Sequence, residues 1–417
     1  MMIKNRIIYT SSSPWRFNIS KAEGSYIWDD KKNKMLDFTS GWNVANLGWN
    51  HPEIIQTVIN QAKLNTYNPM ETTDPAQATY AKKLTDSLPK GFNVICRATG
   101  GTEANEEALK SARAYTKRKK IIGFLDTYHG QSFGDMSLGY RPEYVKHISP
   151  MIPGFIQIEY PSTYNKDISE EELLAQFSKK LENLLRKEDV AAIMSEAGII
   201  TGWGSTLIAP NGYLKLVRRL TKKYGTLLIL DEVGTGFSRC GKLFGMELEN
   251  VTPDIATFAK GISNGSAAIG AMVTSKKIGE EVYDKANLTS TFGWTPIACA
   301  ASLKTLQLHK QLKLWNKAQE NGNYIVSTLR SELSSHPNIG DISGKGMEIG
   351  IKLVTDKKSM KNNEKLFIKV INTAQANGLL LIGDGAGNIQ LMPPLTTTKK
   401  QLDHGIEILV EILNKNL

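Results

Sequence analysis

The sequence of 417 residues predicts an α/β fold, with a large, mainly parallel sheet covered by helices on both faces. Short apolar runs alternate with amphipathic stretches of helical length, which is typical of parallel strands joined by crossover helices. After about residue 297 the pattern changes to long helices followed by shorter strand-like pieces. We therefore expect a large α/β/α domain over residues 49–297, a smaller α+β domain over residues 298–417, and an N-terminal segment, residues 1–48, that packs with the smaller domain.

The elements of the large domain are expected to alternate. Val94, Ile95 and Cys96 form an apolar run, and a helical pattern follows as far as about Arg118. Further apolar runs of strand length lie at residues 121–125, 191–195, 227–230 and 255–258, with a helical pattern at residues 213–223 between the second and the third. Ligands of such sheets bind at the carboxyl ends of the strands, so the residues directly after each run are the candidates for a site.

The rest of the chain shows other patterns. Helical periodicity marks residues 298–312 and 316–333, and strand-like pieces follow at residues 348–354 and 378–382. Another strand-like piece, Ser25 to Trp28, belongs to the N-terminal segment. No long linker rich in Gly, Ser or Pro separates these parts, so we expect them to pack closely together.

Composition and charge exclude several classes of protein. Hydrophobic residues make up 41% and charged residues 22%, which is ordinary for a globular chain and unlike a disordered or fibrous one. The net charge of +10 could indicate nucleic-acid binding, but the basic residues are scattered. Their one dense run, Lys117 to Lys120, ends a predicted helix, where cations complement the helix dipole. We expect no nucleic-acid partner.

Cysteine usage and hydropathy bear on the compartment. Cys96, Cys240 and Cys299 are widely spaced and contain no C-x-x-C pair, so neither a disulfide framework nor a metal site is predicted. No stretch of about 18 apolar residues could span a bilayer, and residues 1–10 contain no sustained apolar core of a signal peptide. We expect a soluble, cytoplasmic protein with no membrane partner.

A glycine pair follows the strand at residue 96. The chain continues through Gly100, Gly101 and Thr102 into a helix. Glycine lets the backbone approach a phosphate closely, and the helix N-terminus offers unpaired N–H groups and the positive end of a dipole. The pattern therefore favours an anion site, although taken alone it fits a plain turn with Thr102 as N-cap equally well.

Two other strand ends carry reactive groups. The run at residues 227–230 ends in Asp231 and Glu232, where a carboxylate could bind a metal, act as a base, or pair with a protonated ring nitrogen. The run at residues 255–258 is followed by Lys260, and a lysine in a partly desolvated pocket is a usable amine nucleophile. Together with the glycine pair, these groups supply the anion anchor, pyridinium partner and Schiff-base amine that pyridoxal phosphate requires.

A second glycine-rich segment allows a different hypothesis. Gly236 to Lys242 nearly matches the P-loop pattern of nucleotide-binding proteins, but Leu243 stands where the pattern needs a serine or threonine for Mg²⁺. The segment also follows Asp231 and Glu232 and does not lead directly from a strand. We regard the match as a coincidence.

The sequence resembles the class III aminotransferases, a pyridoxal-phosphate-dependent family of fold type I that includes the ornithine, acetylornithine and ω-amino acid enzymes. The resemblance covers nearly the whole chain. It is carried by motifs that occur in the family's order, at residues 21–29, 45–52, 100–105, 128–130, 231–237, 260–261, 290–296 and 393–395.

The resemblance implies roles around the cofactor. Gly101 and Thr102 would bind its phosphate. Tyr128 would stack on one face of its ring and Val233 would pack on the other. Asp231 would keep the pyridine nitrogen protonated.

The resemblance also implies roles in the reaction and the assembly. Lys260 would carry the cofactor as a Schiff base and move the proton once the substrate has displaced it. Glu196 resembles the family's strand-end glutamate near the cofactor. Thr291 looks like the threonine that reaches the phosphate of the neighbouring subunit, which implies a homodimer, and Trp42 matches an aromatic position lining the substrate pocket.

Four positions depart from the family's pattern. Ala197 stands where proline is usual, and Gly234 where many members have glutamine. Gln131 and Gln390 each stand where an arginine is frequent, and glutamine cannot grip a carboxylate bidentately. We therefore expect an amino donor whose carboxylate is absent, masked or held elsewhere.

Two questions stay open at this stage. Arg16 or Arg141 could replace the missing arginines. An aminotransferase that passes an amino group from an amine or amino acid to a keto acid or aldehyde is the leading hypothesis, and an aminomutase or epimerase of the same fold is the alternative, because both begin with the same chemistry at Lys260.

Overall fold

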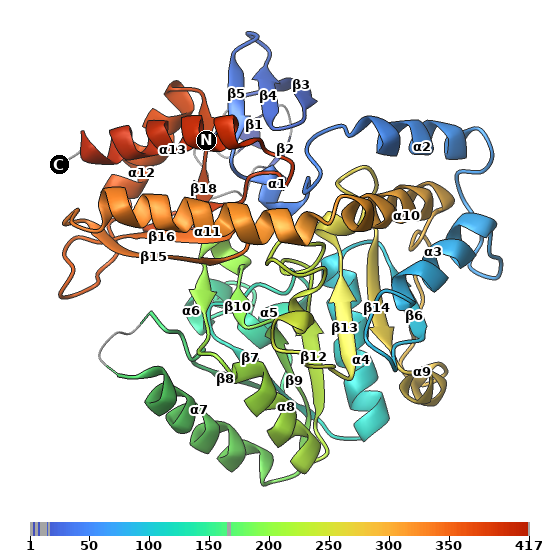
Figure 1. Ribbon diagram of the computed structural model, residues 1–417. Coiled ribbons are helices and arrows are strands. Elements are labelled where there is room, and N and C mark those ends of the chain that lie inside the picture. Colours follow the sequence, from blue (N-terminus) through green and yellow to red (C-terminus); the bar gives the residue numbers. More distant parts are fainter. Residues whose placement is uncertain (1–2, 5–6, 9–14, 16, 165–167, 416–417) are drawn as a thin grey trace.

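The computed structural model describes residues 3–4, 7–8, 15, 17–164 and 168–415. Its centre is a seven-stranded sheet with the strand order β6-β14-β13-β12-β9-β7-β8 (Figure 1). The strands are β6 (Val94–Ala98), β7 (Lys120–Phe124), β8 (Phe155–Ile158), β9 (Val190–Glu196), β12 (Leu227–Asp231), β13 (Ile255–Phe258) and β14 (Gly270–Thr274). β14 pairs antiparallel with both of its neighbours, whereas the other pairs are parallel. The mainly parallel sheet is thus confirmed.

The sheet is covered on both faces because its strands are apolar on both faces. Leu228 and Leu230 of β12 belong to a core shared with the helices α7 (Glu170–Leu185) and α8 (Tyr213–Lys223). Their neighbours Leu227 and Ile229 belong to the core under α4 (Gly101–Thr116). Successive side chains of a strand point to opposite faces, so a continuous apolar run is what a doubly covered strand requires.

Further helices surround this sheet, and short elements fill the remaining connections. The helices are α2 (Pro52–Ala62), α3 (Pro75–Thr85), α5 (Phe133–Gly139), α6 (Pro142–Val145), α9 (Lys276–Val282) and α10 (Pro296–Gln311). The short elements are β1 (Ile3–Lys4), β2 (Ile7–Ile8), β10 (Ile199–Ile200), β11 (Leu207–Ile208), α1 (Ser40–Asn43) and the 3₁₀ turns η1 (Gly202–Gly204), η2 (Gly245–Leu248) and η3 (Lys260–Ile262).

The C-terminal third builds a second core with the start of the chain. Its elements are α11 (Leu314–Leu333), β15 (Ile339–Lys345), β16 (Glu348–Leu353), α12 (Glu364–Ala376), β17 (Leu379–Leu380), β18 (Ile382–Gly383), β19 (Asn388–Leu391) and α13 (Lys399–Asn414). β17 adds to a sheet formed by β3 (Ile19–Glu23), β4 (Tyr26–Asp29) and β5 (Lys34–Asp37), and Figure 1 shows these N-terminal strands (blue) close to α12 and α13 (red). The domain boundaries at residues 48 and 297 stay a prediction.

One buried cation joins the distant parts of the chain. Arg239, which is fully buried, donates hydrogen bonds to the backbone carbonyls of Met347 (3.0 Å) and Pro393 (2.8 Å). It also donates to Asn46 Oδ1 at 2.7 Å and to Ser40 Oγ at 3.3 Å. Because a buried guanidinium is costly unless its donors are used, these four contacts hold the N-terminal, central and C-terminal parts in one arrangement.

Candidate active site

A cavity of about 410 Å³ opens at the carboxyl edge of the large sheet. It lies where β9, β12 and β13 end and where α4 begins, which is the expected ligand position in a sheet of this kind. Its lining residues are Val44, Thr99, Gly100, Gly101, Thr102, Tyr128, His129, Glu196, Thr201, Asp231, Val233, Gly234, Ala259, Lys260, Ser263, Gly265, Ala267, Ala268 and Ile269.

The cavity brings together most of the side chains that the sequence singled out. The predicted residues that line it are Gly101, Thr102, Tyr128, Glu196, Asp231, Val233 and Lys260. Trp42 is not among the lining residues, although Val44, two positions later, is. Thr291 also lies outside the cavity, and its side chain is exposed in the single chain. Arg16 falls outside the described residues.

The start of α4 forms a shallow cradle. A Cβ atom on Gly101 would come within 3.2 Å of both methyl groups of Val233, so only glycine leaves this space open. Gly130 packs as closely, because a Cβ there would lie 2.7 Å from Thr102 Oγ1. Free backbone N–H groups of the first helical turn and the Thr102 hydroxyl can bind an anion in such a cradle. The cradle therefore fits a phosphate group.

Asp231 is held in place by donors from three elements. His129 Nδ1 lies 2.7 Å from Asp231 Oδ2, and Asn105 Nδ2 donates to the same oxygen at 2.9 Å. The backbone N–H of Val233 donates to Oδ1 at 2.8 Å. Asn105 itself is oriented by Thr257 Oγ1, which donates to its Oδ1 at 2.5 Å. These contacts orient a carboxylate toward the cavity while satisfying it as an anion.

Glu196 ends β9 directly beside Asp231 in the strand register. Thr201 donates to its Oε2 twice, from the backbone N–H at 2.9 Å and from Oγ1 at 2.5 Å. Burial and the negative charge of Asp231 raise the pKa of Glu196, and His129 and Thr201 lower it, with a net value of about 7. Glu196 can therefore exchange a proton close to neutral pH.

Thr201 also explains one departure from the family's pattern. A Cβ atom on Gly234 would lie 2.0 Å from Thr201 Oγ1, so Thr201 occupies the space into which a side chain at Gly234 would project. A side chain as large as glutamine therefore has no room at position 234. Thr201 thus takes its place beside Glu196.

Lys260 has the geometry of a constrained functional group. It follows β13 and starts η3 with a φ of 48°, in the left-handed region that residues other than glycine rarely adopt. Its side chain is partly buried, and its Nζ has no hydrogen-bond or ion-pair partner among the described residues. Strained backbone of this kind is often found at functional sites, where it fixes the direction of a side chain.

A buried acid lies just behind the cradle. Asp135 is completely buried, and neither of its carboxyl oxygens has a hydrogen-bond partner in the described part of the chain. Burial, together with the negative charges of Glu106 and Asp231, raises its pKa to about 9. Asp135 is therefore neutral at physiological pH.

No arginine lines the cavity among the described residues. The side chain of Arg141 is engaged by Asp126, with its Nε 2.8 Å from Oδ1 and its Nη2 2.6 Å from Oδ2. Gln390 is buried and donates to the backbone carbonyls of Thr201 (2.9 Å) and Ser205 (3.2 Å). Among the described residues, therefore, no guanidinium lines the cavity to bind a substrate carboxylate.

Residues 8–413 match the family model described as aminotransferase class-III. The chain belongs to the class III aminotransferase family. It is 33% identical to the acetylornithine aminotransferase of Bacillus cereus over 393 residues, which is 94% of each protein. The crystal structure of an (S)-enantioselective omega-transaminase from Thermomicrobium roseum is 31% identical, with a TM-score of 0.91, and the match covers 97% of this chain and 94% of that one.

A third relative bears on the cofactor. The taurine:2-oxoglutarate aminotransferase from Bifidobacterium kashiwanohense, solved with PLP and glutamate, is 28% identical with a TM-score of 0.90, over 96% of this chain and 93% of that one. Class III aminotransferases depend on pyridoxal phosphate. The protein is therefore a fold-type I aminotransferase that moves an amino group from a donor to a keto acid, as the sequence predicted.

Sequence reasoning assigned no role to three polar residues of this class III aminotransferase site. His129 and Asn105 hold Asp231, and Thr201 holds Glu196. His129 lies next to Tyr128, and Asn105 lies one helical turn after Gly101, so their positions beside named residues were a usable signal. Thr201 had none, because its contact with Gly234 depends on the path of a loop.

The P-loop hypothesis is wrong for this class III aminotransferase. Residues 236–242 form turns and bends between β12 and the short 3₁₀ turn η2, and no α-helix begins directly after the glycine-rich stretch. Ser238 and Arg239 of this segment are fully buried, and Ser238 Oγ lies 2.8 Å from His309 Nδ1. A phosphate-binding loop needs exposed backbone N–H groups at a helix N-terminus, which this segment does not provide.

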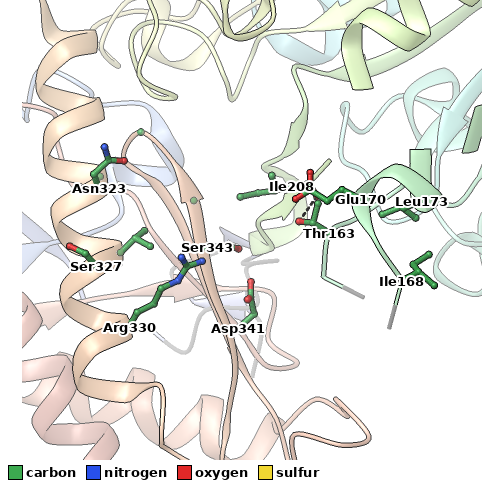
Figure 2. A pocket seen from close by; sticks show the side chains of 14 residues that line it. Thr163, Ile168, Glu170, Leu173, Ile208, Asn323, Ser327, Arg330, Asp341 and Ser343 are labelled. Atoms are coloured by element: carbon green, nitrogen blue, oxygen red, sulfur yellow. Dashed lines mark hydrogen bonds between the residues drawn. The ribbon is translucent and has the colours of Figure 1, made fainter. Parts of the chain in front are cut away.

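A second cavity, of about 690 Å³, lies away from these residues. Figure 2 shows Asn323, Ser327 and Arg330 of α11 on one side of it, and Glu170 and Leu173 of α7 on the other. None of the predicted site residues lines it. In the described part of the chain, no helix is long and apolar enough to cross a membrane, and no cluster of three potential metal ligands occurs.

Proposed function

We propose that this class III aminotransferase holds pyridoxal 5'-phosphate in the 410 Å³ cavity, with the amine of Lys260 as the covalent attachment point. The convergence of Lys260, Asp231 and the glycine start of α4 at one edge of one sheet carries the proposal. When bound, the cofactor supplies an electron sink for the carbon that bears the donor's amino group.

The surrounding residues divide the work of binding. Gly101 and Thr102 hold the phosphate at the start of α4, where the helix dipole favours a dianion. Tyr128 and Val233, which both line the cavity, would hold the cofactor's ring between them. The Asp231 carboxylate, fixed by His129 and Asn105, would stabilise the positive charge of the cofactor's ring nitrogen.

The amine of Lys260 has a second task once the donor is bound. It would then be free to take the proton from the donor carbon that bears the amino group, and to hold that proton for its return. Its strained backbone and the lack of a competing partner among the described residues keep its Nζ available for this step. Glu196, which exchanges a proton near neutral pH, lies on the same side of the cavity as Asp231.

The donor is an amine or amino acid whose α-carboxylate is absent, masked or bound by a group outside the described residues. The engagement of Arg141 by Asp126 and of Gln390 by two backbone carbonyls supports this part of the proposal. A free carboxylate prefers a bidentate guanidinium, and none lines the cavity in the described part of the chain.

The enzyme acts as a homodimer in which Thr291 reaches the partner's cofactor phosphate. Thr291 lies on the surface beside Phe292, which is 64% exposed and whose ring centre lies 5.7 Å from that of Tyr67, with the two rings tilted. Leu64 and Met70 are exposed nearby in the sequence, and exposed apolar groups of this kind mark protein interfaces. The three free cysteines fit a reducing compartment, which we propose to be the cytoplasm.

The visible absorption spectrum of the purified protein tests the cofactor assignment. We expect a band that shifts when one class of donor is added without a keto acid, and absence of the band even after addition of pyridoxal phosphate would overturn the proposal. Lys260→Ala should abolish covalent attachment with an unchanged circular dichroism spectrum, and retained multiple turnover would refute the role of Lys260. An absolute requirement for a keto acid separates aminotransfer from the aminomutase or epimerase alternative.

A further inference from the structure

Three buried oxygen atoms beside the cavity lack a hydrogen-bond donor in the described part of the protein. They are Asn43 Oδ1, Glu196 Oε1 and Gln390 Oε1. Asn43 precedes Val44, which lines the cavity, and Gln390 bonds to Thr201, which also lines it. These side chains belong to one hydrogen-bond network, because Gln390 donates to Thr201 and Glu348, Asn43 donates to Glu348, and Thr201 donates to Glu196. Glu196 and Thr201 of this polar wall line the cavity, whereas Asn43, Gln390 and Glu348 lie behind the lining. Buried acceptors are normally satisfied, so three unsatisfied ones in this network indicate that a donor group belongs there.

The orientations of the Asn43 and Gln390 amides are fixed by the hydrogen bonds of their nitrogens. Asn43 Nδ2 donates to the carbonyl of Gly234 (2.6 Å) and to Glu348 Oε2 (3.1 Å). Gln390 Nε2 donates to Glu348 Oε1 (2.5 Å) as well as to its two backbone carbonyls. Exchanging oxygen and nitrogen in either amide would break these bonds, so the wall presents acceptors and not donors.

Glu348 connects the side-chain amides of Asn43 and Gln390. Its carboxyl group is completely buried and accepts one hydrogen bond from each amide. Burial raises its pKa to about 8, while the positive charges of Arg239 and Lys260 oppose the rise and Glu196 adds to it. A cation entering the cavity would favour the ionised form of Glu348, whereas an anion would be repelled by it.

The chemistry of this wall is complementary to an ammonium group. An ammonium carries three donors and a positive charge, and a carboxylate carries only acceptors and a negative charge. The three oxygens are closed to bulk solvent, but the terminal torsions of Asn, Gln and Glu side chains are soft, so small rotations can turn them toward a bound group.

We propose that Glu348, acting through Asn43 and Gln390, makes the cavity selective for amino donors that carry a second ammonium group in place of a carboxylate. The preferred donors are then diamines. Glu348 is a specificity-determining residue that acts through the two amides, and Lys260 and Asp231 keep their roles. This inference rests on the proposed function of the site.

Matched pairs of donors test it. Each α,ω-diamine of three to six carbons is compared with the ω-amino acid of equal length, by the rate at which the donor alone changes the cofactor's absorption band. We expect the wild-type enzyme to prefer the diamine by about tenfold or more at its best length. In Glu348→Gln the diamine rate should fall and the ω-amino acid rate should rise, so that their ratio drops about tenfold.

Opposite changes in the two rates distinguish selection from damage, because a structural defect lowers both. Equal losses for both donors in Glu348→Gln, or a wild-type preference for ω-amino acids at every length, would overturn the inference. Glu411→Gln, which changes an exposed glutamate of α13, is the matched control and should leave the ratio unchanged.

A second variant tests the inference even if Glu348→Gln fails to fold. Gln390→Arg places a cation in the same wall and should reverse the preference toward ω-amino acids, and an unreversed preference would contradict the inference. Failure of the proposed function is visible separately, since it removes the cofactor band before any donor is added.

Discussion

His129 Nδ1 lies 2.7 Å from Asp231 Oδ2, and both side chains are buried at the carboxyl edge of the large sheet. The two residues are 102 positions apart in the sequence. The contact joins the loop after β7 to the end of β12, and it fixes the orientation of the Asp231 carboxylate. The electrostatic part of the proposed mechanism depends on this pair.

Asp231→Asn should keep the fold and lose most of the activity. The asparagine retains the shape of the side chain but cannot stabilise a positive charge on the ring nitrogen, so we expect kcat to fall at least about 100-fold. Steady-state kinetics and the position of the cofactor's absorption band measure the effect. Asp86→Asn, at an exposed i,i+4 pair with Lys82, is the control. A kcat within a few-fold of wild type would exclude the proposed role of Asp231.

Asp135→Asn should make the protein less sensitive to alkaline pH. The pKa of Asp135 is raised from 3.8 to about 9 in the folded protein, so across that window the folded state holds a proton that the unfolded state has released. Stability therefore falls as the pH rises through the window, and an asparagine escapes this loss. Thermal denaturation should show a larger gain in Tm for the variant at about pH 8 than at about pH 5.

Parallel Tm curves for wild type and Asp135→Asn would show that this carboxyl is ionised in the folded protein. Glu106 and Asp231 face the same group and raise its pKa, so each variant must be compared at equal ionic strength.

Gly234→Ala should be destabilising because of one neighbour. The new methyl group would lie 2.0 Å from Thr201 Oγ1, and overpacking of a buried site costs about 1–3 kcal/mol. Thr201→Ala removes that oxygen, so the double variant should be more stable than the sum of the two single effects predicts. Urea denaturation of the four proteins gives the coupling free energy, and strict additivity would contradict direct contact between the two positions.

Much of the fold followed from local patterns. The helix at residues 213–223 and the strand at residues 255–258 have the predicted bounds, because apolar periodicity and short apolar runs are local signals. β14 was not predicted. Its five residues resemble the other apolar runs, and only its pairing with β6 and β13 makes it antiparallel.

The candidate site, too, could be predicted only in part from the sequence. Lys260, Asp231 and Gly101 could be found because strand ends and helix starts meet at one edge of a parallel sheet. The link between Glu348 and Gln390 could not, since it joins β16 to β19 across 42 residues and depends on the register of those strands. Trp42 is assigned to the substrate pocket by resemblance alone; it does not line the 410 Å³ cavity, and its role stays a prediction.

The buried contacts of Arg239 have a consequence for biosynthesis. Its last acceptor, the carbonyl of Pro393, is made 154 residues later, whereas Ser40 and Asn46 leave the ribosome long before it. A nascent chain can build the large sheet early, but it cannot close the cluster around this guanidinium until Pro393 has emerged. The N-terminal segment therefore lacks its final packing during most of translation. Over this interval its apolar residues are the ones that a chaperone would cover.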